Sequence, residues 1–198
     1  DERHAKFSDL TPLQNLVSKY EKKEFNIEGY PSKNFIEKVI NVNPDQVTLV
    51  PDPPGALTSS FGWDCEKNKS FLTDVIKEFH NNNIRVSLFI NPSIKALENL
   101  DIISTDRVEL YTYYYAHNYS KNKSEAIKSY IEVVRFIVNE FPKIEFNAGH
   151  DLNLENLDYF LKSINNIKEV SIGHALICDT FEFGLEKTIK KYLEITSK

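Results

Sequence analysis

Two segments of the sequence place a glycine and a histidine directly after an apolar run. FNAGHDL contains Gly149 and His150. SIGHAL contains Gly173 and His174. Glycine lets the backbone approach a ligand closely and point N–H groups at it, and a helix N-terminus favours negative charge. The two pairs predict a phosphate site with histidines able to exchange protons; the alternative is that the glycines merely end strands and the histidines are ordinary loop residues.

Two glutamates lie inside otherwise apolar, strand-like segments. Glu28 is in FNIEGY and Glu109 is in RVELYT. A carboxylate that points into a protein interior is costly unless it is paired or functional, and partial burial of a carboxyl raises its pKa toward the range of a general base. We therefore expect Glu28 to be partly buried and catalytic, unless it faces the helices or pairs structurally. Glu109 shares this argument, with an outward-facing pair to Arg107 as its alternative.

The elements that must position these residues alternate between short β-branched runs and helical patterns, an order that predicts a parallel sheet. The expected strands are residues 25–30, 46–51, 84–90, 107–112, 144–149 and 169–173. The first expected helix is capped by Thr11, begins at Pro12 and has a buried stripe of Leu13, Leu16, Val17 and Tyr20. The others are residues 32–42, 70–82 and 124–141, a helix that begins at Asn153, and a last helix marked by the apolar residues Leu185, Ile189 and Leu193.

Six βα repeats fit either an open doubly wound sheet or part of a (β/α)₈ barrel. The first helical pattern precedes any strand and the sequence contains no methionine, so we expect N-terminal residues to be missing. The shortfall from the roughly 250 residues of a typical barrel is about two strands and one helix. We therefore predict a single domain over residues 1–198, a (β/α)₈ TIM barrel whose first strand, first helix and second strand are absent. The Gly-His pairs then follow strands 7 and 8, where such barrels commonly bind phosphate.

Composition excludes several classes of protein. The net charge of −5 and the isoelectric point near 5.6 argue against a nucleic-acid surface. No apolar run approaches the roughly 18 residues of a membrane span, and no signal-peptide pattern opens the sequence, so we expect a cytoplasmic protein. Cys65 and Cys178 belong to no metal-binding pattern and are expected to be reduced.

Taken in order along the chain, these motifs resemble the pyridoxine 5′-phosphate synthase family of TIM-barrel enzymes. The matching segments are DERH, NIEGY, a Thr-containing loop after LVP, VSLFI, VELYT, FNAGHDL and SIGHAL. The resemblance implies condensation of 3-amino-2-oxopropyl phosphate with 1-deoxy-D-xylulose 5-phosphate to pyridoxine 5′-phosphate, phosphate and water by acid–base catalysis. It implies small phosphorylated substrates, no metal or redox cofactor, no nucleic-acid or membrane partner, and a homo-oligomer, an octamer in this family.

The resemblance also implies catalytic roles. Glu28 matches the family's catalytic glutamate, and His150 matches its proton donor. Glu109 matches a glutamate that stabilises charge late in the reaction. Asp151 stands where the common motif has glycine; it is expected to orient His150 or a substrate hydroxyl, and only its backbone N–H is carried over as a ligand contact, because a carboxylate beside a phosphate is unfavourable.

Binding roles follow from the same matches. His4 and Thr58 match contacts to the deoxyxylulose phosphate, and Gly173 and His174 match the pair that binds the aminooxopropyl phosphate. The loop over residues 51–64 departs from the common family version, so Thr58 is a looser match. Within this loop, Trp63 is expected to pack against the rim rather than to stack on a ligand.

Five further histidine or aromatic positions are interpreted without the family. His80 and His117 are expected to be surface residues, because neither has a partner pattern. The three tyrosines 113–115 are expected either to pack or to line the site.

Two other functions compete with this interpretation. A barrel aldolase with the same phosphate site would need a Schiff-base lysine, but no lysine lies inside the six expected strands, and Lys143 and Lys168 only precede strands. A non-catalytic phosphate- or vitamer-binding barrel would need the glycines, yet it has no reason to keep a buried Glu28 together with His150.

Overall fold

The computed structural model describes residues 2, 4–52, 55–56 and 58–197. Asp1 and Arg3 of the DERH segment, and three residues of the 51–64 loop, lie outside these ranges. The chain divides into two compact units, Asp1–Asn91 with Lys95–Val108 (unit 1) and Pro92–Ile94 with Glu109–Lys198 (unit 2). That residues 1–198 form a single domain stays a prediction.

The strands of the described chain form one six-stranded sheet in the order β1-β2-β3-β4-β5-β6. Their bounds are β1 Asn26–Gly29, β2 Gln46–Leu49, β3 Arg85–Ile90, β4 Arg107–Tyr111, β5 Glu145–Gly149 and β6 Ile167–Ser171. The pairs β1–β2, β2–β3 and β5–β6 are parallel. A doubly wound sheet reverses its strand order at a switch point, whereas a (β/α)₈ barrel adds strands sequentially. The observed order is therefore that of the barrel class, as predicted.

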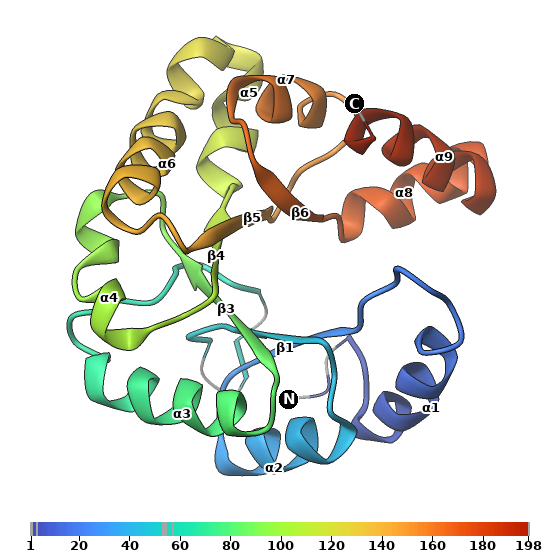
Figure 1. The fold of residues 1–198 in the computed structure, drawn as a ribbon. Helices are drawn as coiled ribbons and strands as arrows, with labels where there is room; N and C mark the ends of the chain where they lie inside the picture. Colours follow the sequence, from blue (N-terminus) through green and yellow to red (C-terminus); the bar gives the residue numbers. More distant parts are fainter. Residues whose placement is uncertain (1, 3, 53–54, 57, 198) are drawn as a thin grey trace. The chain divides into compact units, whose positions relative to one another are not determined.

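Helices connect the strands throughout the described residues (Figure 1). Their bounds are α1 Phe7–Val17, α2 Lys33–Val42, α3 Lys69–Asn81, the short 3₁₀ helix η1 Ile94–Leu97, α4 Leu100–Ile103, α5 Tyr113–Ala126, α6 Lys128–Glu140, α7 Leu157–Ser163, α8 His174–Phe183 and α9 Leu185–Thr196. Ser32 caps α2 as expected, because its hydroxyl accepts a hydrogen bond from the Phe35 N–H at 3.2 Å. In unit 2, α8 and α9 lie side by side (Figure 1).

The strands in the middle of the sequence are buried almost without interruption. Every residue of β2 and β4 is buried, and so is every residue but the first of β3 and β5. Such continuous burial is typical of parallel strands covered on both faces, and it explains why these runs read as β-branched and apolar rather than alternating. β1 and β6 are more exposed, and this bears on the glutamate in β1.

Several element boundaries were predicted wrongly. α1 begins at Phe7 rather than after Thr11, because Asp9 accepts a hydrogen bond from the Lys6 N–H at 2.9 Å and closes an earlier first turn. The stripe expected to be buried on α1 is largely exposed, and Leu10 is the residue of α1 that is buried. β6 begins two residues earlier than expected.

The segment 113–163 also departs from the expected helices. Residues 113–126 form α5, which begins immediately after Thr112, and α6 follows separately. Asn153 does not cap a helix. Its side-chain oxygen instead accepts the N–H groups of Glu155 and Asn156, at 2.9 and 3.1 Å, and α7 begins only at Leu157.

Candidate active site

The residues just past β5 are held in an uncommon backbone conformation. His150 has φ of 89° and Asp151 has φ of 61°, both in the left-handed region. Thr112, at the end of β4, holds this bend: its N–H and its hydroxyl donate to the Gly149 carbonyl, at 2.9 and 2.7 Å, and its hydroxyl also contacts the His150 carbonyl. Non-glycine residues keep such conformations only where surrounding contacts enforce them, and these residues cluster at functional sites.

The Glu109 side chain of β4 packs closely against Gly149 of β5. Glu109 is only 3% exposed, so its carboxylate is buried. A Cβ atom built on Gly149 would lie 2.1 Å from Glu109 Oε1 and 2.9 Å from Ser171 Cβ. Gly149 is therefore required sterically, because it leaves the space that the Glu109 carboxylate occupies one residue before His150.

Two tyrosine rings surround the His150 imidazole. Tyr111 meets it edge-to-face with ring centroids 4.8 Å apart, and Tyr113 lies at 6.2 Å with a similar perpendicular geometry. The tyrosines at 113–115 thus divide between the expected roles. Tyr113 borders His150, Tyr114 is 54% exposed, and Tyr115 is fully buried.

His117 is a surface residue, as predicted, but it has close neighbours. It lies on α5, its ring centroid is 3.8 Å from that of Tyr113, and its Nδ1 lies 3.8 Å from Asp151 Oδ2. The Asp151 carboxylate also lies 3.3 Å from His150 Nδ1. The structure therefore brings His117, Asp151 and His150 together, and His117 is exposed but not isolated. The signal in the sequence was its spacing, since it lies one helical turn after Tyr113.

A buried network of tyrosine hydroxyls fixes the loop that follows His150. Tyr115 donates to the Asn156 carbonyl at 2.6 Å, and Tyr130 donates to the Tyr111 carbonyl at 2.8 Å. Asn156 Nδ2 in turn donates to the Asp151 carbonyl at 3.2 Å. Burial raises the pKa of the Tyr115 and Tyr130 hydroxyls, so both remain protonated donors.

The second Gly-His pair lies at the start of α8. Gly173 is the N-cap of α8 and His174 is its first residue, and both are exposed. A Cβ atom built on Gly173 would meet nothing within 4 Å. The first N–H groups of a helix have no intrahelical partner, so this turn offers donors for an anion beside unfilled space.

Unit 1 contains Glu28, the third residue of β1, which pairs in register with Thr48 of β2. Glu28 is exposed, so the expectation of partial burial was wrong. The reason is the position of β1 in the described sheet, where only β2 flanks it. The next residue, Gly29, is needed for packing, since a Cβ there would lie 2.4 Å from the Phe35 ring of α2.

The remaining predicted binding residues of unit 1 are exposed. His4 and Thr58 both lie on the surface of unit 1. The loop that contains Thr58 is anchored further along, where the Trp63 indole N–H donates to the Leu49 carbonyl at 2.9 Å and the ring stacks with Tyr30. Trp63 is 4% exposed, which confirms the prediction that its ring packs against the protein rather than being left open to stack on a ligand.

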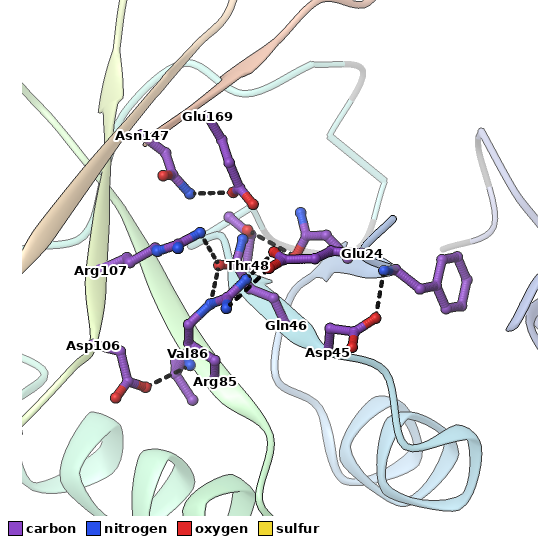
Figure 2. A network of polar contacts seen from close by, with 12 residues as sticks. Glu24, Asp45, Gln46, Thr48, Arg85, Val86, Asp106, Arg107, Asn147 and Glu169 are labelled. Carbon is purple, nitrogen blue, oxygen red and sulfur yellow. Dashed lines mark hydrogen bonds and ion pairs between the residues drawn. The ribbon is translucent and has the colours of Figure 1, made fainter. Parts of the chain in front are cut away.

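A polar network lies at the amino ends of the strands of unit 1 (Figure 2). Gln46 Oε1 accepts from Arg85 Nε at 2.8 Å and from an Arg107 guanidinium nitrogen at 3.1 Å, and Arg85 also pairs with Glu24. In unit 2, Asn147 donates to Glu169 at 2.6 Å (Figure 2). In barrels of this class catalytic groups gather at the carboxyl ends of the strands, so amino-end networks serve stability.

Metal and thiol chemistry have little support in the described part of the chain. No group of three or more His, Cys, Asp or Glu side chains suited to a metal ion occurs among those residues. Cys65 is buried, and burial raises the pKa of its thiol to about 12, whereas Cys178 is exposed. No helix there has the length and apolar character needed to cross a membrane.

Comparison with known proteins identifies the family. The family model described as "Pyridoxal phosphate biosynthesis protein PdxJ" matches residues 1–198. The chain belongs to the PdxJ family. Proteins named pyridoxine 5′-phosphate synthase are similar to it along almost its full length. That of Cytophaga hutchinsonii is 48% identical over 198 residues, which cover 100% of this chain and 81% of the relative. That of Bacteroides fragilis is 47% identical over 192 residues, which cover 97% and 78%.

Solved structures support the fold of this PdxJ chain. A tryptophan synthase α-subunit from Pyrococcus furiosus superimposes with a TM-score of 0.61 at 16% identity, covering 97% of this chain and 72% of that one. A 4-hydroxy-2-oxoglutarate aldolase superimposes with a TM-score of 0.60 at 12% identity, covering 96% and 76%. At these identities the likeness concerns the fold alone.

One lysine bears on the aldolase alternative. Lys168 lies within β6 rather than before it, contrary to the sequence analysis. It is the second residue of the strand, near the amino end, and its Nζ pairs with Glu145 Oε1 at 3.1 Å. A Schiff-base lysine belongs at the carboxyl end, so Lys168 does not favour an aldolase.

Proposed function

We propose that this PdxJ-family protein condenses 3-amino-2-oxopropyl phosphate with 1-deoxy-D-xylulose 5-phosphate to pyridoxine 5′-phosphate, phosphate and water. The observation that carries the proposal is the family match over residues 1–198, together with relatives of the same name at 44–48% identity. The reaction needs repeated proton transfers, and acid–base side chains at the carboxyl ends of strands supply them.

The proton transfers are assigned to two residues. Glu28, exposed near the carboxyl end of β1, is the general base, because substrate can reach its carboxylate. His150 is the proton donor. The Thr112 hydrogen bonds and the two tyrosine rings hold its backbone and its imidazole, which lowers the entropy lost when substrate aligns with it.

Glu109 has an electrostatic role in this proposal. Its carboxylate is 3% exposed and lies against Gly149. A fixed negative charge in a water-poor site stabilises positive charge that develops late in the reaction more strongly than the same charge in water.

The phosphates are assigned to backbone donors and polar side chains. The start of α8, with Gly173 and His174, binds the aminooxopropyl phosphate, because both residues are exposed and the space beside Gly173 is unfilled. His4 and Thr58 contact the deoxyxylulose phosphate. Asp151 contributes its backbone N–H.

The same family assignment extends to assembly, cofactors and compartment. We propose a cytoplasmic homo-oligomer, an octamer as in the family, that acts without a metal or redox cofactor. Sedimentation equilibrium tests the assembly, and a monomer at assay concentration would contradict it.

Product formation tests the function directly. The purified protein is incubated with both phosphorylated substrates, with and without EDTA, and pyridoxine 5′-phosphate is quantified by mass spectrometry. Turnover that is unaffected by EDTA is expected. Binding of both phosphates without any product would favour the non-catalytic binding protein, and activity restored by one metal after chelation would contradict the metal-free mechanism.

A further inference from the structure

The Asp151 side chain lies beside the imidazole that the proposed mechanism uses. Asp151 Oδ2 is 3.3 Å from His150 Nδ1 and 3.8 Å from His117 Nδ1. The Asp151 side chain is 32% exposed and that of His150 is 22% exposed, so water screens this pair only partly. His117 is 54% exposed and also lies 3.1 Å from the Tyr113 carbonyl, so its interaction with Asp151 is the weaker one.

Side-chain contacts hold the backbone at Asp151 and at the residue before it. The Asp151 carbonyl accepts from Asn156 Nδ2 at 3.2 Å, and the preceding carbonyl, that of His150, contacts the Thr112 hydroxyl. Asp151 has φ of 61°, a conformation that glycine adopts more readily than any other residue. The backbone therefore does not demand an aspartate at this position, and the contact of its carboxylate with His150 needs a separate reason.

The rotation and the tautomer of the His150 ring decide which of its nitrogens can face a substrate. Tyr111 and Tyr113 confine the ring plane through perpendicular ring contacts. A carboxylate at Nδ1 selects one tautomer, because it holds a proton on Nδ1 and leaves Nε2 for the substrate.

We propose that Asp151 is a positioning residue for His150. Its carboxylate accepts the Nδ1–H of His150 and keeps the ring in one orientation. In the protonated ring, Nε2–H is then the proton that passes to substrate, and the neutral ring that remains is the Nδ1–H tautomer. In the structure the 3.3 Å contact has the distance of an ion pair but not the geometry of a hydrogen bond, and Nδ1 is buried, so the proposed bond requires a small rotation of one of the two side chains. The catalytic part of this inference rests on the proposed function.

Two variants separate positioning from a purely structural role. Asp151→Gly removes the carboxylate and suits the backbone at φ of 61°. Asp151→Asn keeps the size and a weaker acceptor. Asp158→Asn is the matched control, because Asp158 is on α7 and pairs with Lys162 in an ordinary i,i+4 surface contact.

Steady-state kinetics gives the first readout. We expect Asp151→Gly to lower kcat by roughly tenfold or more, a part of the about 10² to 10⁴ that a general acid–base group contributes, with KM nearly unchanged. Asp151→Asn is expected to lie between Asp151→Gly and wild type, and Asp158→Asn to match wild type. Thermal unfolding of each variant establishes that it is folded; if Asp151→Gly is not, Asp151→Asn decides.

The second readout does not depend on turnover. The chain has five histidines, so long-range ¹H–¹⁵N spectra of the imidazoles are simple, and His150→Gln assigns the His150 signals. At a pH where the imidazoles are neutral, wild type is expected to show the Nδ1–H tautomer at His150. Asp151→Gly is expected to shift it toward Nε2–H, the tautomer that predominates in free histidine.

The outcomes distinguish the two proposals. Wild-type kcat and an unchanged Nδ1–H tautomer in Asp151→Gly would overturn the positioning role, because a glycine would then serve equally well. If wild type makes no product, the proposed function fails, and the tautomer comparison alone decides the role of Asp151: a shift in Asp151→Gly supports it, and no shift overturns it.

Discussion

Two glycines of the candidate site differ in what makes them necessary. A Cβ on Gly149 would collide with the Glu109 carboxylate at 2.1 Å, so the fold itself requires glycine there. A Cβ on Gly173 would meet no protein atom within 4 Å. The unfilled space at Gly173 is therefore available to a ligand, and side chains placed there would occupy it.

This difference predicts the effect of Gly173→Val. The branched side chain would fill the space beside the first N–H groups of α8 without meeting the protein. We expect the unfolding midpoint to stay near that of wild type and the affinity for 3-amino-2-oxopropyl phosphate to fall about tenfold or more, a loss of roughly 1.4 kcal/mol. Calorimetric titration measures it, with Gly173→Ala as a milder comparison. Unchanged affinity in folded Gly173→Val would remove the phosphate assignment.

At the scale of elements, the strands could be predicted well and several helix starts could not. Buried parallel strands appear in the sequence as continuous apolar runs, and β2 to β5 all lie within their expected segments. The turn at Asn153 was misread as a helix cap, because in a helix cap and in this turn alike the side-chain oxygen accepts the N–H groups two and three residues further along the chain. α1 was misread because Pro12, a good first residue of a helix, is tolerated here in its second turn.

The link between β4 and the bend after β5 predicts the effect of Thr112→Val. This change keeps the shape but removes the hydroxyl that bonds the carbonyls of Gly149 and His150. We expect a loss of about 1–2 kcal/mol in the free energy of unfolding, together with a lower kcat, because the backbone that positions His150 loosens. Thr73→Val is the control, since that hydroxyl bonds the Lys69 carbonyl within α3. Equal stability and activity in both variants would show that Thr112 does not hold the bend.

At the scale of the whole molecule, the family and the barrel class could be predicted from residue order, whereas the roles of the site residues stay predictions. Contacts that depend on tertiary packing could not be predicted. The sequence gives no direct sign that His117 lies beside Asp151, nor that Gln46 bridges Arg85 and Arg107. The exposure of Glu28 was also missed, because an apolar neighbourhood in sequence does not reveal how many strands flank β1.

Thiol accessibility tests the folded molecule independently of activity. The thiolate is the reactive form, and burial raises the pKa of Cys65 to about 12, so Cys65 should not react at neutral pH, whereas Cys178 is exposed. We expect Ellman's reagent to modify one thiol in the native protein and both after denaturation. On the alkaline side, Cys65 should remain protonated in the folded protein up to about pH 12. Rapid modification of Cys65 at neutral pH would contradict the buried position.

The most direct measurement of the central claim is the turnover of Glu28→Gln. Glutamine keeps the volume and much of the hydrogen bonding of the side chain but cannot accept the proton, so both substrates should still bind while kcat falls about 10²- to 10⁴-fold with KM nearly unchanged. Glu37→Gln, on the exposed side of α2, is the control and should turn over as wild type does. Pyridoxine 5′-phosphate formed by Glu28→Gln within about threefold of the wild-type rate would contradict the assignment of the general base.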